Sequence, residues 1–329
     1  MLMKKTILFI STALLTMLTA CSGGVTINET NFPDENFRDY LLSQDYGKDG
    51  VLTDDEIAGV TELILIEKSI QSLKGIEYFT ALTGLNCAGN QLTSLDVSNC
   101  TALTSLMCAH NGLTSLDFSK NAAMTDVNCS FNQLTSLDVS KCTKLTLLMC
   151  YENNLTSLDV SKCTELEKLM CTENQLTSLD LSNCTKLELV YGHDNQLTSL
   201  DVSKCTALET LTCGDNQLTS LDVSNCTKLD ILLCSYNQLT SLDVSKCTAL
   251  TSLACSGNQL TSLDVSNCTE LETLSCSGNQ IKGAAMDALV NGLPKVDEGE
   301  LKVIDSQGNE QNVMTSSQVA AAKAKGWKL

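Results

Sequence analysis

Residues 92–112 read LTSLDVSNCTALTSLMCAHNG, and this 21-residue unit recurs along the chain with little change. Its first apolar position returns every 21 residues without insertion or deletion, at Leu92, Leu113, Leu134, Leu155, Leu176, Leu197, Leu218, Leu239, Leu260 and Ile281. A fixed short period predicts a solenoid, in which each repeat forms one coil that stacks on its neighbours.

Each repeat carries the pattern of one strand and one tight return. Apolar and polar residues alternate around Leu106 and Cys108, which predicts a short strand. The stretch from Asp96 to Thr101 has room only for an extended arm or a single turn of helix. The seven apolar positions of one copy would form the core of the coil: Leu92, Leu95, Val97, Cys100, Leu103, Leu106 and Cys108.

Asparagine occupies one column in every coil, at Asn90, Asn111, Asn132, Asn153, Asn174, Asn195, Asn216, Asn237, Asn258 and Asn279. A carboxamide both donates and accepts, so a stacked column can satisfy buried backbone groups of adjoining coils. The motif LxxLxCxxN resembles the leucine-rich repeat LxxLxLxxN, with Cys in the third apolar place. The repeat length, the LTSLDVS segment and the Cys substitution are similar to those of the internalin family, in particular its cysteine-ladder member.

This resemblance implies an α/β solenoid: a leucine-rich-repeat horseshoe with a parallel β-sheet on its concave face and short irregular or 3-10 convex arms. It also implies a helical N-terminal cap and a mixed α/β C-terminal cap around about ten coils. We assign the N-terminal cap to residues 27–75, the repeats to 76–281 and the C-terminal cap to 282–329. The family resemblance further implies an adhesin-like surface binder without catalytic activity.

The cysteines of the repeats form two columns. In-register strands lie about 4.8 Å apart with parallel Cβ vectors, whereas a disulfide needs converging Cβ atoms about 3.8 Å apart. We therefore expect buried thiols in the first column. Partial oxidation stays open for the second column, whose arm is less regular. Zinc binding is the other alternative, but it would need convergent ligands, which a linear stack does not supply. The columns are Cys87, Cys108, Cys129, Cys150, Cys171, Cys213, Cys234, Cys255 and Cys276, and Cys100, Cys142, Cys163, Cys184, Cys205, Cys226, Cys247 and Cys268, interrupted by Gly192 and Asn121 respectively.

A column of aspartates starts at Asp96 and recurs through Asp264, each two residues before a serine. Stacked carboxylates repel one another unless each accepts a local hydrogen bond, which predicts Asx turns. A calcium-binding stack is the alternative, although the glycine-rich nonapeptide spacing of calcium solenoids is missing.

The outward positions on the predicted sheet vary while the return arms do not. Early and late coils place small residues there, but the middle coils place large apolar, aromatic and histidine side chains beside an acidic edge formed by Glu152, Glu173, Asp194 and Asp215. An extended exposed apolar patch indicates a partner site; packing of these side chains on one another is the alternative. The predicted ligand-binding residues are Met107, His110, Phe131, Met149, Tyr151, Met170, Tyr191, His193, Leu233 and Tyr236.

The N-terminus has the features of an export signal. Lys4 and Lys5 precede an apolar run from Ile7 to Leu18 that is too short to span a bilayer. Leu18-Thr19-Ala20-Cys21 resembles a bacterial lipobox, so we predict a signal peptide at 1–20, lipidation of Cys21 and an anchor and spacer at 21–26. The lipid would attach the protein to the bacterial cell envelope, at the outer membrane or cell surface, and would be its only membrane contact. An ordinary signal peptide is the alternative.

The segment Asp45 to Glu56 resembles an EF-hand loop, although Gly47 stands where an oxygen ligand belongs. Calcium would be held by the side chains of Asp45, Asp49 and Glu56 and the carbonyl oxygen of Val51. Internalins carry an EF-hand-like helical cap, so a purely structural role competes with calcium binding. We predict no other cofactor.

Composition excludes several classes of function. The net charge of −18 becomes −20 once Lys4 and Lys5 are removed, which opposes nucleic-acid binding. His110 and His193 are nearly four coils apart, and no nucleophile elbow or HExxH motif occurs, so we predict no enzymatic activity. The expected function is a monomeric envelope protein that binds a protein or glycan through its concave face; a structural or assembly role in the envelope is the alternative.

Overall fold

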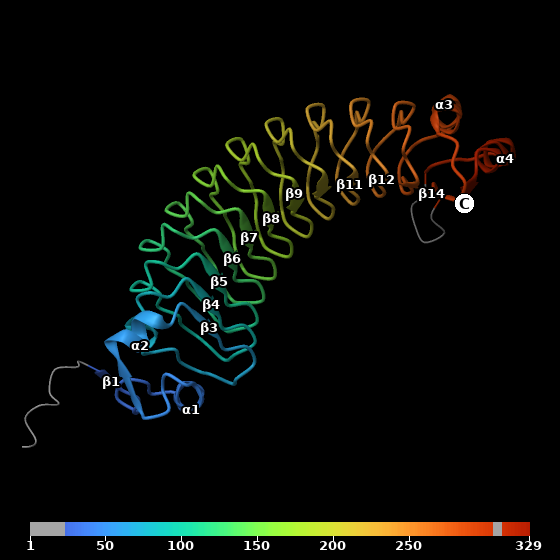
Figure 1. The fold of residues 1–329 in the computed structure, drawn as a ribbon. Coiled ribbons are helices and arrows are strands. Elements are labelled where there is room, and N and C mark those ends of the chain that lie inside the picture. The colour runs from blue at the N-terminus through green and yellow to red at the C-terminus, as the bar shows by residue number, and fades with distance from the viewer. Residues whose placement is uncertain (1–23, 305–310) are drawn as a thin grey trace, which may run out of the picture.

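The computed structural model describes residues 24–304 and 311–329. The predicted signal peptide, the lipidation of Cys21 and the turn expected at 306–309 lie outside the described residues. The coils stack into a curved arch with α1 and α2 at one end and α3 and α4 at the other (Figure 1). The predicted leucine-rich-repeat horseshoe with its concave parallel sheet is confirmed.

A thirteen-stranded parallel sheet runs along the whole arch in the order β15-β14-β13-β12-β11-β10-β9-β8-β7-β6-β5-β4-β3. The strands of the coils occupy β3 Glu62–Ile64, β4 Gly84–Asn86, β5 Ser105–Met107, β6 Asp126–Asn128, β7 Leu147–Met149, β8 Lys168–Met170, β9 Leu189–Tyr191, β10 Thr210–Thr212, β11 Ile231–Leu233, β12 Ser252–Ala254 and β13 Thr273–Ser275. From β4 to β13 each pairs with the next at a shift of 21 residues, so equivalent positions of successive coils form straight columns.

The core of each coil consists of the apolar positions predicted from the repeat. Leu92, Cys100, Leu103, Leu106 and Cys108 are fully buried, and the same columns stay buried along the arch. The return arms are built of consecutive tight turns, as in the hydrogen bonds from the Cys100 N–H to Val97 O and from the Leu103 N–H to Cys100 O, both 3.0 Å. Among the described residues one 3-10 helix occurs, η1 Ile76–Tyr78.

The N-terminal cap covers the first coil. It comprises β1 Gly24–Thr26 and β2 Val51–Thr53, paired antiparallel, with helices α1 Glu35–Ser43 and α2 Asp54–Gly59. Asp34 caps α1 by accepting a hydrogen bond from the Phe37 N–H, which explains why the helix starts there. The sheet begins at β3, inside the segment that we assigned to the cap. This first coil has Leu65 in place of the Cys that marks the later repeats, so the sequence pattern did not identify it.

The C-terminal cap continues the sheet beyond the last repeat. Helix α3 spans Ala284–Gly292 and is followed by β14 Gly299–Lys302, α4 Ser316–Ala324 and β15 Trp327–Lys328. The indole Nε1 of the buried Trp327 donates to Pro294 O at 2.9 Å, which ties the end of the chain to the turn after α3. No helix among the described residues is long and apolar enough to cross a membrane.

Candidate functional site on the concave face

All seventeen cysteines in the described part of the chain are buried thiols. Burial raises the pKa of the first-column thiols, for example that of Cys171 to about 12. The second column is held by weak S–H hydrogen bonds to the preceding coil: the Cys184 thiol donates to Val160 O at 3.5 Å, and that of Cys226 to Val202 O at 3.7 Å. Both columns therefore belong to the core, away from the concave surface.

The asparagine column joins adjacent coils. The Asn132 Nδ2 donates to Cys108 O of the previous coil at 3.1 Å and to Cys129 O at 3.0 Å, and its Oδ1 accepts from the Leu113 N–H at 3.0 Å. Equivalent bonds recur at the other coils. The predicted structural role of this column is confirmed, and its side chains are not available to a ligand.

The aspartates of the return arms are also structural. Each of the nine accepts a hydrogen bond from the serine N–H two residues later, as between Asp159 and Ser161 at 2.9 Å. Hydrogen bonding to Ser161 lowers the pKa of Asp159, while the coulombic effect of Asp138 opposes this shift. The predicted Asx turns are confirmed, and these hydrogen bonds stabilise the charged stack.

The predicted calcium ligands of the N-terminal cap lie in separate local contacts. Asp45 pairs with the Lys48 ammonium, and the Asp49 Oδ1 accepts from the Val51 N–H at 3.0 Å. The Glu56 Oε2 accepts from the Thr53 N–H at 2.8 Å and completes the capping box of α2. Across residues 24–304 and 311–329 no group of three or more His, Cys, Asp or Glu side chains could hold a metal ion.

The predicted ligand-binding residues fall into three columns along the concave sheet. The first column holds the last residue of a strand, and these side chains are half-buried: Met107, Met149, Met170, Tyr191 and Leu233. The second column lies two residues later and contains Tyr151 and His193. The third lies one residue further on, immediately before the asparagines, and contains His110, Phe131 and Tyr236.

The third column has an unusual backbone. His110, Phe131 and Tyr236 have φ of 54°, 52° and 55°, in the left-handed region, as do Glu152, Glu173, Asp194 and Asp215 in the coils between them. The coil of β4 and the last two repeats instead place glycine there, at Gly89, Gly257 and Gly278, whereas the first coil has Glu67 with φ of 52°. Left-handed backbone costs a non-glycine residue about 1–2 kcal/mol, so the middle coils hold their side chains at this edge against a conformational cost.

One part of the aromatic surface packs on itself. The rings of His110 and Phe131 stack with centroids 3.9 Å apart, and Phe131 meets Tyr151 edge to face at 5.2 Å. The alternative that these side chains contact one another therefore holds for this cluster. Their packing forms a continuous ring surface across three coils, which is still partly exposed.

The other part surrounds a groove of about 520 Å³ across β9 to β12. Four predicted residues line it: Tyr191, His193, Leu233 and Tyr236. The other lining residues were not among the predicted ligand-binding residues: Thr210, Thr212, Gly214, Asp215, Ile231, Ser235 and Ala254. Asp215 belongs to the predicted acidic edge and Ile231 to the variable outward columns, whereas the hollow itself depends on small residues in neighbouring coils.

The groove combines an apolar surface with negative charge. Tyr236 is 58% exposed and forms one of its walls. The His193 Nδ1 lies 2.6 Å from the Asp194 Oδ2. Burial and the neighbouring Asp194 raise the pKa of Asp215, and His193 opposes this shift. Such a surface can bind a ligand by apolar contact and by charge.

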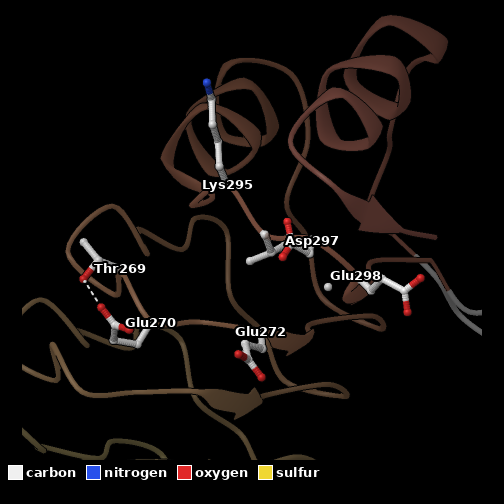
Figure 2. A pocket seen from close by; sticks show the side chains of 8 residues that line it. Thr269, Glu270, Glu272, Lys295, Asp297 and Glu298 are labelled. Carbon is white, nitrogen blue, oxygen red and sulfur yellow. Dashed lines mark hydrogen bonds between the residues drawn. The ribbon is translucent and has the colours of Figure 1, made fainter.

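A second hollow, of about 480 Å³, lies between the last coil and the C-terminal cap. Figure 2 shows Glu270, Glu272, Asp297 and Glu298 around it, with Lys295 pointing away from the carboxylates of the last coil. Glu270 accepts a hydrogen bond from the Thr269 hydroxyl at 3.2 Å. This second hollow is polar, and its lining lacks the aromatic residues of the concave groove.

Comparisons with known proteins agree with this architecture. A family model described as leucine-rich repeats in two copies matches residues 248–291. The functional domain of InlJ from Listeria monocytogenes, which includes a cysteine ladder, is 38% identical with a TM-score of 0.75, covering 80% of this chain and 59% of that one. No curated protein sequence matches.

Two further solved structures share the fold at lower identity. The internalin InlF from Listeria monocytogenes is 24% identical with a TM-score of 0.70, covering 94% of this chain and 98% of that one. A leucine-rich-repeat protein of Leptospira interrogans is 24% identical with a TM-score of 0.63, covering 70% and 62%. Together with the parallel concave sheet and asparagine column, these findings define a leucine-rich-repeat protein. Within that class the chain is internalin-like, and its columns of cysteine are the feature it shares with InlJ.

Proposed function

We propose that this protein is an adhesin-like binding protein of the bacterial cell envelope that recognises a protein or a glycan through the concave face of its middle coils. The supporting observation is the distribution of outward side chains. Met149, Tyr151 and Tyr191 lie on the middle coils, where the terminal coils present residues such as Gly84 and Ser252. The core columns repeat along the arch with few exceptions, such as Asn121 and Gly192, so the packing of the coils does not explain this difference.

Partly exposed apolar and aromatic side chains on one face support contact with a macromolecule. Tyr and Trp anchors within a polar rim are typical of protein interfaces. Here the ring cluster of His110, Phe131 and Tyr151 and the groove beside Tyr191 and Tyr236 lie on the same sheet. A partner that follows the curve of the arch could contact both.

The predicted lipid on Cys21 supplies a tether in this proposal. The described chain starts at Gly24, in strand β1 of the N-terminal cap, so the anchor would be attached at the end of the arch opposite α3 and α4 (Figure 1). That position leaves the concave sheet unobstructed by the attachment. Metabolic labelling with a fatty-acid analogue tests the tether, because Cys21→Ala should abolish incorporation.

The binding proposal is tested by comparing capture of partners by the mature protein and by a variant with Tyr151→Ala, Tyr191→Ala and Tyr236→Ala. The matched control replaces three exposed threonines of the return arms, Thr156→Ala, Thr177→Ala and Thr219→Ala. We expect the tyrosine variant to lose captured protein or glycan while the control retains it. Equal capture by all three proteins would overturn the proposal, and capture of envelope components alone would favour the structural role.

A further inference from the structure

Two acidic columns border the apolar strip of the middle coils. One lies immediately before the strands and contains Glu167, Glu188, Glu209 and Asp230; the other follows them and contains Glu152, Glu173, Asp194 and Asp215. The strands are in register, so members of each column repeat about every 4.8 Å. Lys168 is the basic residue that the strands β7 to β11 place between them.

The groove lies at one end of this bordered strip. The residues that line it include no Lys or Arg. Asp215 is one of the lining residues, and Asp194, paired with His193, is its neighbour in the previous coil. Burial and then the like charge of Asp194 raise the pKa of Asp215, and His193 opposes this shift.

The apolar part of the groove suits a long aliphatic stem with a polar end. Ile231, Leu233 and Ala254 contribute outward side chains from successive strands, and Tyr191 and Tyr236 add aromatic rings. Lysine and arginine bury their methylene stems on apolar surfaces while the charged head stays near water or a counter-charge. Aromatic faces also attract such cations.

We propose that this groove holds a lysine or arginine side chain from a basic segment of a protein partner, with the stem on Ile231 and Leu233 and the cation beside Asp215 and Asp194. This inference rests on the proposed function and selects a polypeptide as its ligand. The acidic columns then guide the flanking basic residues of the same segment, because clefts lined by one sign of charge concentrate ligands of the other.

Charge also argues against the other class of ligand. A sialylated or sulfated glycan would approach two columns of carboxylates and a protein of net charge −18. A neutral glycan can donate hydroxyl hydrogen bonds to these carboxylates but forms no ion pair with them. A basic segment, by contrast, gains a favourable charge interaction at each of these coils that it crosses. It also supplies a hydrogen-bond donor to Thr212, a buried residue of the groove whose Oγ1 has no hydrogen-bond partner among the described residues.

The experiment titrates the full mature protein with a capped peptide, Gly-Lys-Leu-Lys-Leu-Lys-Gly, and with the same peptide carrying acetylated lysines. Binding is followed by calorimetry and by chemical-shift changes of Tyr191 and Tyr236. A neutral hexaose and a sialylated trisaccharide serve as glycan probes. We expect the cationic peptide to bind at least about tenfold more tightly than its acetylated form, with shifts at both tyrosines.

Two variants assign the effect to the groove. Asp194→Asn with Asp215→Asn should weaken the cationic peptide at least about tenfold. The charge-matched control, Glu270→Gln with Asp297→Asn in the hollow of Figure 2, should leave it unchanged. An equal effect of both variants, or tighter binding of either glycan, would overturn the inference. If the peptide fails while the tyrosine variant still loses its captured partner, the inference falls and the proposed function stands.

Discussion

The Asn121 Nδ2 donates to Cys100 O at 2.9 Å, at a position where the neighbouring coils carry cysteine. A second bond runs to Val97 O at 3.1 Å, but the Asn121 Oδ1 is buried without a hydrogen-bond partner among the described residues. The amide of Asn121 therefore takes the place of a second-column thiol. Its NH2 group is hydrogen-bonded, but its carbonyl oxygen is left without a donor in the part of the chain that the structure describes.

Asn121→Cys should stabilise the protein. The substitution removes a buried unsatisfied acceptor, whose desolvation costs about 1–3 kcal/mol, and restores a thiol that can donate weakly to the preceding coil. We expect the urea midpoint to rise, corresponding to about 1 kcal/mol in the free energy of unfolding. Cys142→Asn is the converse control and should lower it; a lower midpoint for Asn121→Cys would contradict the argument.

Asn153→Ala should be strongly destabilising. The Asn153 side chain donates to Cys129 O at 3.0 Å and to Cys150 O at 3.1 Å, and accepts from the Leu134 N–H at 3.0 Å. Its removal leaves buried backbone groups unpaired, at a cost of about 3 kcal/mol or more. The neighbouring Asn154 is exposed, so Asn154→Ala is the control. Equal denaturation midpoints for the two variants would show that the column is dispensable.

The thiols of the folded protein should resist alkylation. Thiolate is the reactive form, and burial raises the pKa of Cys129 to about 12 and that of Cys268 to about 11. We expect iodoacetamide at pH 8 to label none of the seventeen buried cysteines in native protein and all of them in denaturant, as counted by mass spectrometry. Labelling of either column in the native state would place that column outside the core, and missing labels in denaturant would reveal disulfides.

The same pKa shifts predict loss of stability in alkali. Below the pKa of an unfolded cysteine, about 8.5, thiols are protonated in both states and the folded state keeps its full advantage. Between that value and the folded pKa of about 11 to 12, only the unfolded chain loses protons. Each such thiol lowers the unfolding free energy by about 1.4 kcal/mol per pH unit. Circular dichroism under reducing conditions should therefore show a falling melting temperature above pH 9; an unchanged value at pH 10 would contradict this.

Glu56→Ala tests the N-terminal cap. Glu56 completes the capping box with Thr53, so its loss should destabilise α2 by about 1 kcal/mol. Since the predicted calcium ligands are engaged in local contacts, we expect the same small fall in melting temperature with chelator and with added calcium. The control is Asp55→Ala in the same helix. A calcium-dependent rise in the wild type that Glu56→Ala abolishes would instead identify Glu56 as a ligand.

Repetition explains how much of this fold could be predicted from the sequence. A residue such as Asn132 or Asp159 has the same neighbours in every coil, so one local argument predicted the hydrogen bonds of a whole column. The strand β3 was missed because its coil lacks these markers. Its register became evident only from pairing, where Leu63 lies beside Leu85 of the first regular strand.

The candidate site was only partly predictable for the same reason. The variable columns identified Tyr191, His193 and Tyr236, but the groove between them depends on what the adjacent coils omit, as at Gly214. The stacking of His110 on Phe131 likewise depends on side-chain directions at left-handed backbone positions. Contacts between different columns of different coils have no period, so the repeat pattern could not predict them.

The left-handed position before each asparagine has a consequence for the concave surface. Glycine adopts this conformation without strain at Gly89, Gly257 and Gly278, whereas seven consecutive coils from His110 to Tyr236 have non-glycine residues there, for which the conformation is strained. Replacing any of these residues with glycine would remove the backbone strain and, with it, one side chain of this surface. The side chains at this edge are therefore present although glycine would be the less strained residue at each of the seven positions.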